Sequence, residues 1–282
     1  MSRAGTFQAM QDLTFPQALR RVMLAPAAAI FAAFWLLPMA MLARLSASGG
    51  VRGYLDILGS SRYLDSLLVT LALAAGVTVA ALLLSLVAGL FLARHDFRGR
   101  DALIAMLTLP LAFPGVVVGF MVIMLAGRQG LAATLSQALL GHRIVFAYSL
   151  AGLFLGYLYF SIPRVILTVM AAAEKLDPSL EEAARALGAT PWQVLRDVVL
   201  PALAPALTAA AALCFATAVG AFGTAFTLAT DIDVLPMEIY TAFTLNADVP
   251  TAATLSLVLG GVTWLVLLWS DSLGNATAAT GG

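Results

Sequence analysis

The chain has 282 residues and no net charge at pH 7, with 61% hydrophobic and only 11% charged residues. Its mean hydropathy of +0.97 excludes a water-soluble globular domain and indicates an integral membrane protein. The charge balance gives no reason to expect nucleic acid as a partner. Cys214, the only cysteine, excludes an intrachain disulfide and a multi-cysteine metal site, and we expect it to be a small buried residue.

Apolar runs long enough to cross the hydrocarbon core of a bilayer recur along the chain. They cover residues 22–43, 64–93, 102–127, 144–172, 200–229 and 251–269. The first run lacks a clear small-residue cleavage site and is interpreted as a retained helix, not a signal peptide. We therefore expect an all-α protein. Its parts are an N-terminal segment (1–21), a six-span membrane domain (22–269) and a flexible C-terminal tail (270–282).

Lys and Arg in the loops predict the orientation, because loops rich in these residues stay in the cytoplasm. The larger set precedes the first span or follows the second and fourth: Arg3, Arg20, Arg21, Arg94, Arg98, Arg100, Lys175, Arg185 and Arg196. The smaller set is spread over longer loops on the other side: Arg44, Arg52, Arg62, Arg128 and Arg143. Both termini and the loop 173–199 are therefore predicted to be cytoplasmic.

Pairs of glycines at GxxxG spacing occur in the third and fourth predicted spans, at Gly115 with Gly119 and at Gly152 with Gly156. This spacing lets helices approach closely. We favour packing within the chain over a contact with a second copy, because glycine is frequent in membrane helices generally.

Proline and one buried charge stand out in the same two spans. Pro110, Pro114 and Pro163 are expected to kink their helices, because each removes a backbone donor. Arg164 is the one charge well inside a span, and a mid-bilayer arginine costs about 3 kcal/mol. We favour snorkelling or a contact near a cytoplasmic gate over a role with substrate.

The loop between the fourth and fifth spans predicts two short helices joined at Gly188, which is placed to end the first one in a left-handed turn. Asp177 with Pro178 offers one N-terminal cap, and Ser179 with Glu182 offers an overlapping capping box, so the cap stays open. The second start signal is Thr190, Pro191, Trp192 and Gln193.

The first of these helices is amphipathic. Its apolar face carries Leu180, Ala183, Ala184 and Leu187, and its polar face carries Glu181, Glu182 and Arg185. A Glu181–Arg185 pair adds roughly 0.3 kcal/mol. An amphipathic connector lying on the membrane interface is the plain alternative for such a loop.

The loop also resembles the cytoplasmic signature loop of permease subunits in binding-protein-dependent (type I) ABC importers. That pattern is EAA, three residues, Gly, nine residues and Ile-x-Leu-Pro. Here Glu182-Ala183-Ala184 is followed at these spacings by Gly188 and then by Val198-Val199-Leu200-Pro201. The only departure is Val198, where the family usually carries Ile. The joint match favours the family over a simple interface connector.

The resemblance implies a six-helix importer permease fold whose coupling helix inserts into a groove on a separate ATPase subunit. We assign ATPase coupling to Leu180, Glu181, Glu182, Ala183, Ala184, Arg185, Leu187, Gly188 and Pro201. It further implies a second permease subunit, identical or homologous, and a periplasmic solute-binding protein. The protein would lie in a bacterial inner membrane and work by alternating access.

No enzyme activity is expected in this chain. Its single lysine, Lys175, follows no glycine-rich turn, so the chain is not its own P-loop ATPase. ATP and Mg are expected on the partner, and no cofactor is expected here. His95 and His142 lie in loops on opposite sides of the membrane, so no metal site is expected.

The solute is predicted less directly. Thr217, Gly220, Thr224 and Thr227 form a strip in the fifth span that either lines a path or has its hydroxyls bonded to its own helix. The outer loop holds Asp231, Asp233, Glu238 and Asp248, which either attract a cationic solute or are simply solvated.

The overall length, the run Asp177-Pro178-Ser179-Leu180-Glu181-Glu182 and the segment 235–253 look most similar to the spermidine/putrescine group. A polyamine-like solute is therefore expected, with aminoethylphosphonate, ferric iron, thiamine and sulfate left open. A passive channel and a non-transporting assembly or sensor subunit are the alternatives from other classes. Neither would carry out ATP-dependent uptake.

Overall fold

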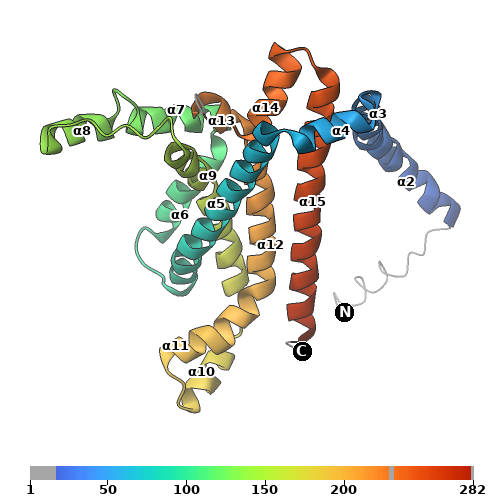
Figure 1. The fold of residues 1–282 in the computed structure, drawn as a ribbon. Helices are drawn as coiled ribbons and strands as arrows, with labels where there is room; N and C mark the ends of the chain where they lie inside the picture. Colours follow the sequence, from blue (N-terminus) through green and yellow to red (C-terminus); the bar gives the residue numbers. More distant parts are fainter. Residues whose placement is uncertain (1–16, 229–231, 281–282) are drawn as a thin grey trace.

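The structure is a computed structural model that describes residues 17–228 and 232–280. Throughout these ranges the regular elements are helices, with no strand. Four long helices lie side by side and form the bundle (Figure 1): α5 (Ser61–Arg94), α9 (Leu150–Ala173), α12 (Leu200–Val219) and α15 (Val249–Thr280). Six segments of the described chain are long and apolar enough to cross a membrane, which confirms the all-α, six-span prediction.

The first half of the first span stands apart from the bundle (Figure 1), whereas its second half packs against α15. It consists of α2 (Gln17–Phe31), the π-helical turn η1 (Ala32–Leu36) and α3 (Leu37–Ser48), and its most apolar stretch buries no residue. Only the α3 end is fixed, since the Ser46 hydroxyl lies 2.8 Å from the Thr254 hydroxyl of α15. The helix α4 (Gly50–Gly59) then connects this span to α5.

The third predicted span, 102–127, is not one helix. It comprises α6 (Arg100–Thr108), the 3-10 turn η2 (Leu109–Ala112) and α7 (Gly115–Ala126). Pro110 and Pro114 therefore break the helix and do not merely kink it, because each lacks the N–H that would continue it. Pro163, by contrast, lies inside the continuous α9.

Beyond α7 the chain forms α8 (Leu131–Leu140), which projects sideways from the bundle (Figure 1). By length and composition the third candidate membrane segment is Gly115–Leu140, so it shares only α7 with the predicted span. The sequence analysis did not foresee α8.

The GxxxG glycines pack within the chain, as predicted. Gly119 of α7 lies against α13 (Phe222–Leu228), so closely that a Cβ on Gly119 would lie 1.6 Å from the Thr227 hydroxyl. A Cβ on Gly156 of α9 would lie 2.7 Å from a methyl carbon of Thr224. Only glycine allows α7 and α9 to approach α13 this closely.

The two ends of the bundle differ (Figure 1). At one end lie α10 (Pro178–Ala186) and α11 (Pro191–Val194), and at the other lie α4, α8, α13 and α14 (Leu235–Tyr240). A second π-helical turn, η4 (Thr241–Leu245), follows α14. We refer to these as the α10 end and the α14 end.

The C-terminal helix α15 is longer than its predicted span of 251–269. It continues as helix to Thr280, through the described part of the segment 270–282 that the sequence analysis expected to be a flexible tail. No proline follows Trp269 to stop it, and the alanines there favour helix. The predicted N-terminal segment, 1–21, lies mostly outside the described residues.

Candidate functional site

The helix α10 begins at the Asp177 cap and not at the overlapping capping box. A carboxylate oxygen of Asp177 accepts a hydrogen bond from the backbone N–H of Ser179 at 2.9 Å, and Pro178 occupies the first helical turn. This hydrogen bond holds the pKa of Asp177 below its ordinary value, because it stabilises the charged form.

The faces of α10 are oriented opposite to those of an ordinary surface helix. Leu180 is 54% exposed and Leu187 is 90% exposed, while the Glu181 side chain is only 14% exposed. Ala184 alone of the apolar face packs inward, on a cluster built around Val194 and neighbouring residues of α12. The helix therefore presents leucine outward and a carboxylate inward, as a surface that contacts a partner does.

Glu181 faces inward because it is held by two arginines. It accepts hydrogen bonds from Arg94, the last residue of α5, and from Arg185 one turn along α10 at 3.1 Å. The second contact confirms the predicted i, i+4 pair. The first, which ties α10 to α5 across the chain, was not predicted. Glu182, in contrast, is exposed and forms no ion pair within the described part of the chain.

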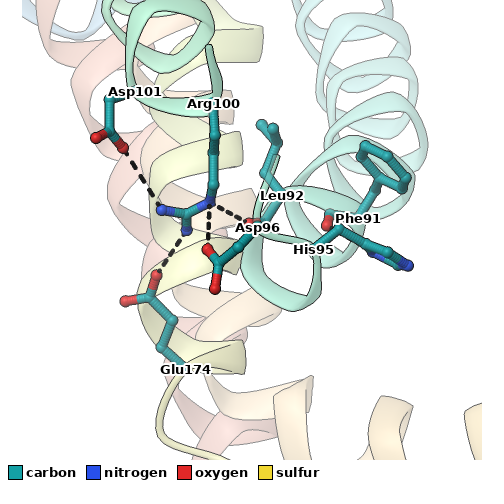
Figure 2. A network of polar contacts seen from close by, with 7 residues as sticks. All are labelled: Phe91, Leu92, His95, Asp96, Arg100, Asp101 and Glu174. Atoms are coloured by element: carbon teal, nitrogen blue, oxygen red, sulfur yellow. Dashed lines mark hydrogen bonds and ion pairs between the residues drawn. The ribbon is translucent and has the colours of Figure 1, made fainter. Parts of the chain in front are cut away.

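A second ionic contact lies beside the first (Figure 2). The Arg100 guanidinium at the start of α6 is 3.3 Å from Glu174, which follows α9, and lies near Asp96 and Asp101. It also donates to the backbone carbonyl of Leu92 at 2.8 Å. The α5–α6 loop is thereby fastened to the C-terminal end of α9, next to the start of the α10 loop.

Gly188 ends the first helix as predicted, with φ of +87°, a left-handed conformation that favours glycine. Thr190 then caps α11 in a capping box with Gln193, also as predicted. The second short helix is not separate, however. From Pro191 the chain runs through α11, the π-helical turn η3 (Leu195–Val199) and α12 as one rod that ends at Val219.

The π-helical turn explains why the sequence pattern missed this continuity. Pro201 has no N–H to donate, and its ring crowds the carbonyl of the preceding turn, so the helix widens at η3 instead of ending. Pro201 therefore lies within the rod and not on α10 with the other predicted coupling residues. Gly188 lies in the turn between α10 and this rod.

At its far end the rod stops at Gly220, so the predicted fifth span 200–229 is broken before α13. The hydroxyl of Tyr157, a buried residue of α9, donates to the exposed carbonyl of Ala221 at 2.8 Å. This hydrogen bond satisfies a backbone group that a helix break would otherwise leave unpaired.

A cavity of about 370 Å³ lies beside this break. Its walls come from η2, the first turn of α7, the middle of α9 and the α12–α13 junction, and three of the four predicted path residues line it: Thr217, Gly220 and Thr224. Thr227 does not line it, since its hydroxyl bonds to its own helix and packs on Gly119. Arg164, to which the sequence analysis gave a gate-side contact, also lines the cavity.

Two of the four acidic residues that the sequence analysis placed in the outer loop have partners in the structure, Glu238 and Asp248. Glu238 is 4% exposed and accepts a hydrogen bond from Arg62 at 2.9 Å, which joins α14 to α5. Asp248 accepts the backbone N–H of Thr251 at the start of α15. Asp231 lies outside the described residues. Because the charge of Glu238 is paired with Arg62, Glu238 is not free to attract a cationic solute, as one of the two sequence-based alternatives required.

Residues 85–277 match the family model described as "binding-protein-dependent transport system inner membrane component". The match covers most of the chain, including the loop and the rod. The chain belongs to this family. As a member of it, the protein is a multi-pass inner membrane permease of the type I ABC importer class, and not an enzyme.

Individual relatives of this permease agree. It is 35% identical over 214 residues to a probable molybdenum ABC transporter permease protein of Haloferax volcanii, covering 73% of this chain and 77% of the relative. It is 31% identical over 242 residues to the sulfate transport system permease protein CysT of Escherichia coli, covering 84% and 86%. Neither name supports the polyamine group to which the sequence analysis assigned the chain.

Among solved structures, the permease resembles a chain of a bacterial alginate ABC transporter crystallised with an alginate-bound periplasmic protein. The TM-score is 0.80 and the identity 19%, over 90% of this chain and 93% of that one. At this identity the similarity concerns the fold alone, and it extends the agreement beyond residues 85–277 to most of the chain.

Proposed function

We propose that this permease couples ATP hydrolysis on separate ATPase subunits to the import of a tetrahedral oxyanion of the molybdate or sulfate class. The solute class is supported by the names of the relatives, which carry molybdenum or sulfate. A polyamine finds no support there, and the paired charge of Glu238 removes part of the electrostatic reason for expecting a cation.

The observation that carries the coupling role is the outward face of α10. Leu180, Ala183 and Leu187 are exposed at the end of the bundle, where water would make exposed leucines unfavourable. A groove on an ATPase subunit would cover them, and the exposed Glu182 carboxylate would meet a basic residue at its rim. In this role α10 is the coupling helix.

Movement of α10 would reach the membrane by two routes. The joint at Gly188 passes it to the rod 191–219, and the Arg94–Glu181 contact passes it to α5. Both elements contact each other within the bundle, so a displacement at the α10 end would tilt them together. Such tilting is the rigid-body movement that alternating access requires.

The remaining partners follow from the same proposal. A second permease subunit, identical or homologous, would supply the second coupling helix, and a periplasmic binding protein would deliver the solute at the α14 end. Arg94, Arg98, Arg100 and Lys175 gather at the α10 end, which favours a cytoplasmic location for that end and for the C-terminus. The ATP and Mg would be held by the ATPase.

Reconstitution tests this function. The permease is placed in proteoliposomes with the ATPase and binding protein of its own system, and ATP-dependent uptake of radioactive molybdate and sulfate is measured. Leu187→Ser is expected to abolish uptake and to release the ATPase in a pull-down. Leu139→Ser is the matched control, because Leu139 is also strongly exposed, at 80% against 90% for Leu187, but lies on α8 at the other end. Equal behaviour of the two variants would exclude α10 as the docking helix.

A further inference from the structure

The cavity beside the helix break has an uneven set of polar groups. Arg164 is its only charged lining residue, and no carboxylate of the described chain reaches the cavity wall. The other lining groups are hydroxyls, backbone and apolar side chains, among them Thr217, Thr224 and Phe160. A cavity with one fixed positive charge and no acid attracts anions and repels cations.

The hydroxyls of the cavity are already engaged. Thr224 donates to the backbone carbonyl of Gly115 at 3.0 Å, and Thr217 donates to the carbonyls of Leu213 and Cys214 at 2.9 Å. The Thr224 bond holds α7 against α13, and the Thr217 bonds stay within α12. A hydroxyl has one hydrogen to donate, and here it is already used. These hydroxyls therefore contribute little to the binding of an anion, which needs hydrogen-bond donors.

The guanidinium of Arg164 differs from them. It has no hydrogen bond and no ion pair to any side chain that the structure describes, although it is half-buried in α9. It offers five N–H donors in a planar fork that matches the oxygens of a tetrahedral oxyanion. An arginine this deep in a membrane-spanning helix is unfavourable unless water or an anion meets it.

The first turn of α7, at Gly115 and Val116, lines the cavity, and no side chain caps this helix. The N–H groups of a first helical turn have no partner within the helix and favour negative charge. Arg164 of α9 and the first turn of α7 thus line one cavity.

We propose that this cavity binds an oxyanion through Arg164 while the solute crosses the membrane, so that Arg164 is a specificity-determining residue of the permease. The inference rests on the proposed function for the identity of the solute. It differs from the gate-side or snorkelling role that the sequence analysis favoured for Arg164. Arg164 lies roughly 14 Å along α9 from its α10 end at 1.5 Å per residue, well inside the candidate membrane span Leu150–Ala173.

The test uses the complete complex with its ATPase and binding protein in phosphatidylcholine vesicles. Arg164→Gln removes the charge, Arg164→Lys keeps it without the fork, and Arg143→Gln removes a charge from an exposed loop as the matched control. Initial rates of [35S]sulfate and molybdate uptake are measured at saturating binding protein, together with the ATPase rate. Binding of [35S]sulfate to the complex without binding protein is measured by scintillation proximity.

Arg164→Gln is expected to lower the uptake rate and the direct sulfate binding about tenfold or more, as the loss of a charge-assisted hydrogen bond implies. The ATPase rate stimulated by the binding protein should stay within about twofold of wild type, since the α10 loop is untouched. Arg164→Lys should recover part of the uptake, and Arg143→Gln should match wild type.

Three results would overturn the inference. The first is unchanged sulfate binding and uptake in Arg164→Gln, which leaves the proposed function standing. The second is an equal loss of uptake and ATPase rate in both Arg164 variants, which shows a structural role. The third is sulfate binding abolished in wild type by adding phosphatidylglycerol, which shows that a lipid phosphate occupies the site. Arg164-dependent sulfate binding in a wild type that imports neither anion would instead refute the proposed function and support the site.

Discussion

Gly188 connects α10 to the membrane-crossing rod 191–219. Its replacement by alanine should reduce the amount of solute transported for each ATP hydrolysed. Its φ of +87° is one that residues with a Cβ rarely adopt. No atom lies within 4 Å of where a Cβ would be built, so the cost comes from the backbone conformation alone. For an alanine that cost is about 1–2 kcal/mol.

A penalty of this size changes the population of the observed turn by roughly 5- to 30-fold. Gly188→Ala is therefore expected to lower the population of the observed α10 position, and Gly188→Asn to lower it less, because asparagine tolerates the left-handed region. Gly141 provides the matched control, since it also has a positive φ, of +75°, with open space around it, but follows α8 at the α14 end.

The assay is the ratio of solute taken up to ATP hydrolysed in proteoliposomes with the ATPase and binding protein. Gly188→Ala should lower this ratio several-fold, Gly188→Asn should lower it less, and Gly141→Ala should leave it unchanged. Equal ratios for Gly188→Ala and Gly141→Ala would refute the reasoning, because both substitutions impose the same backbone penalty.

Three further predictions concern contacts described above. Arg94→Ala and Glu181→Ala, in a double-mutant cycle read by thermal unfolding, should show a coupling of about 0.5–1 kcal/mol, and a zero value contradicts the tie between α5 and α10. Gly119→Ala should destabilise the complex by about 1–3 kcal/mol, and Thr227→Ala in the same chain should restore part of this by removing the clashing oxygen; no restoration contradicts the packing. The pKa of Asp177 is lower in the folded protein than in the unfolded chain. The cap therefore contributes its full stabilisation of α10 above the unfolded-state pKa, and this stabilisation is lost as the pH falls through the folded-state pKa. In hydrogen exchange, the amides of wild-type α10 should therefore lose protection as the pH falls. Asn also caps helices, so Asp177→Asn should match wild type at neutral pH but lack this loss at acid pH. If the variant loses protection at acid pH as wild type does, Asp177 is not the titrating cap.

The sequence predicted the elements that follow from local patterns. Long apolar runs gave the helices α5, α9 and α15, and the start and stop signals around Gly188 and Thr190 gave the loop, because caps and left-handed turns depend on a few neighbouring residues. The sequence offered two caps for α10, and the structure uses Asp177 and not the capping box at Ser179, since a helix has only one N-cap residue.

The errors arose where proline acts differently in different surroundings. Pro110 and Pro114 break the third span, Pro163 is tolerated inside α9, and Pro201 only widens a turn. Packing against neighbouring helices decides between these outcomes, and a single sequence does not show it. The Arg94–Glu181 contact was not predicted for the same reason, because its two residues lie far apart in the chain and only the packing of the helices brings them together.

The order of the helices along the chain bears on how the protein is made. The first span is synthesised first, but α15, against which its α3 half packs and which carries the Thr254 partner of Ser46, is synthesised last. The apolar surface of the first span, none of which is buried in its most hydrophobic stretch, is therefore open to a neighbouring subunit before the polypeptide is finished.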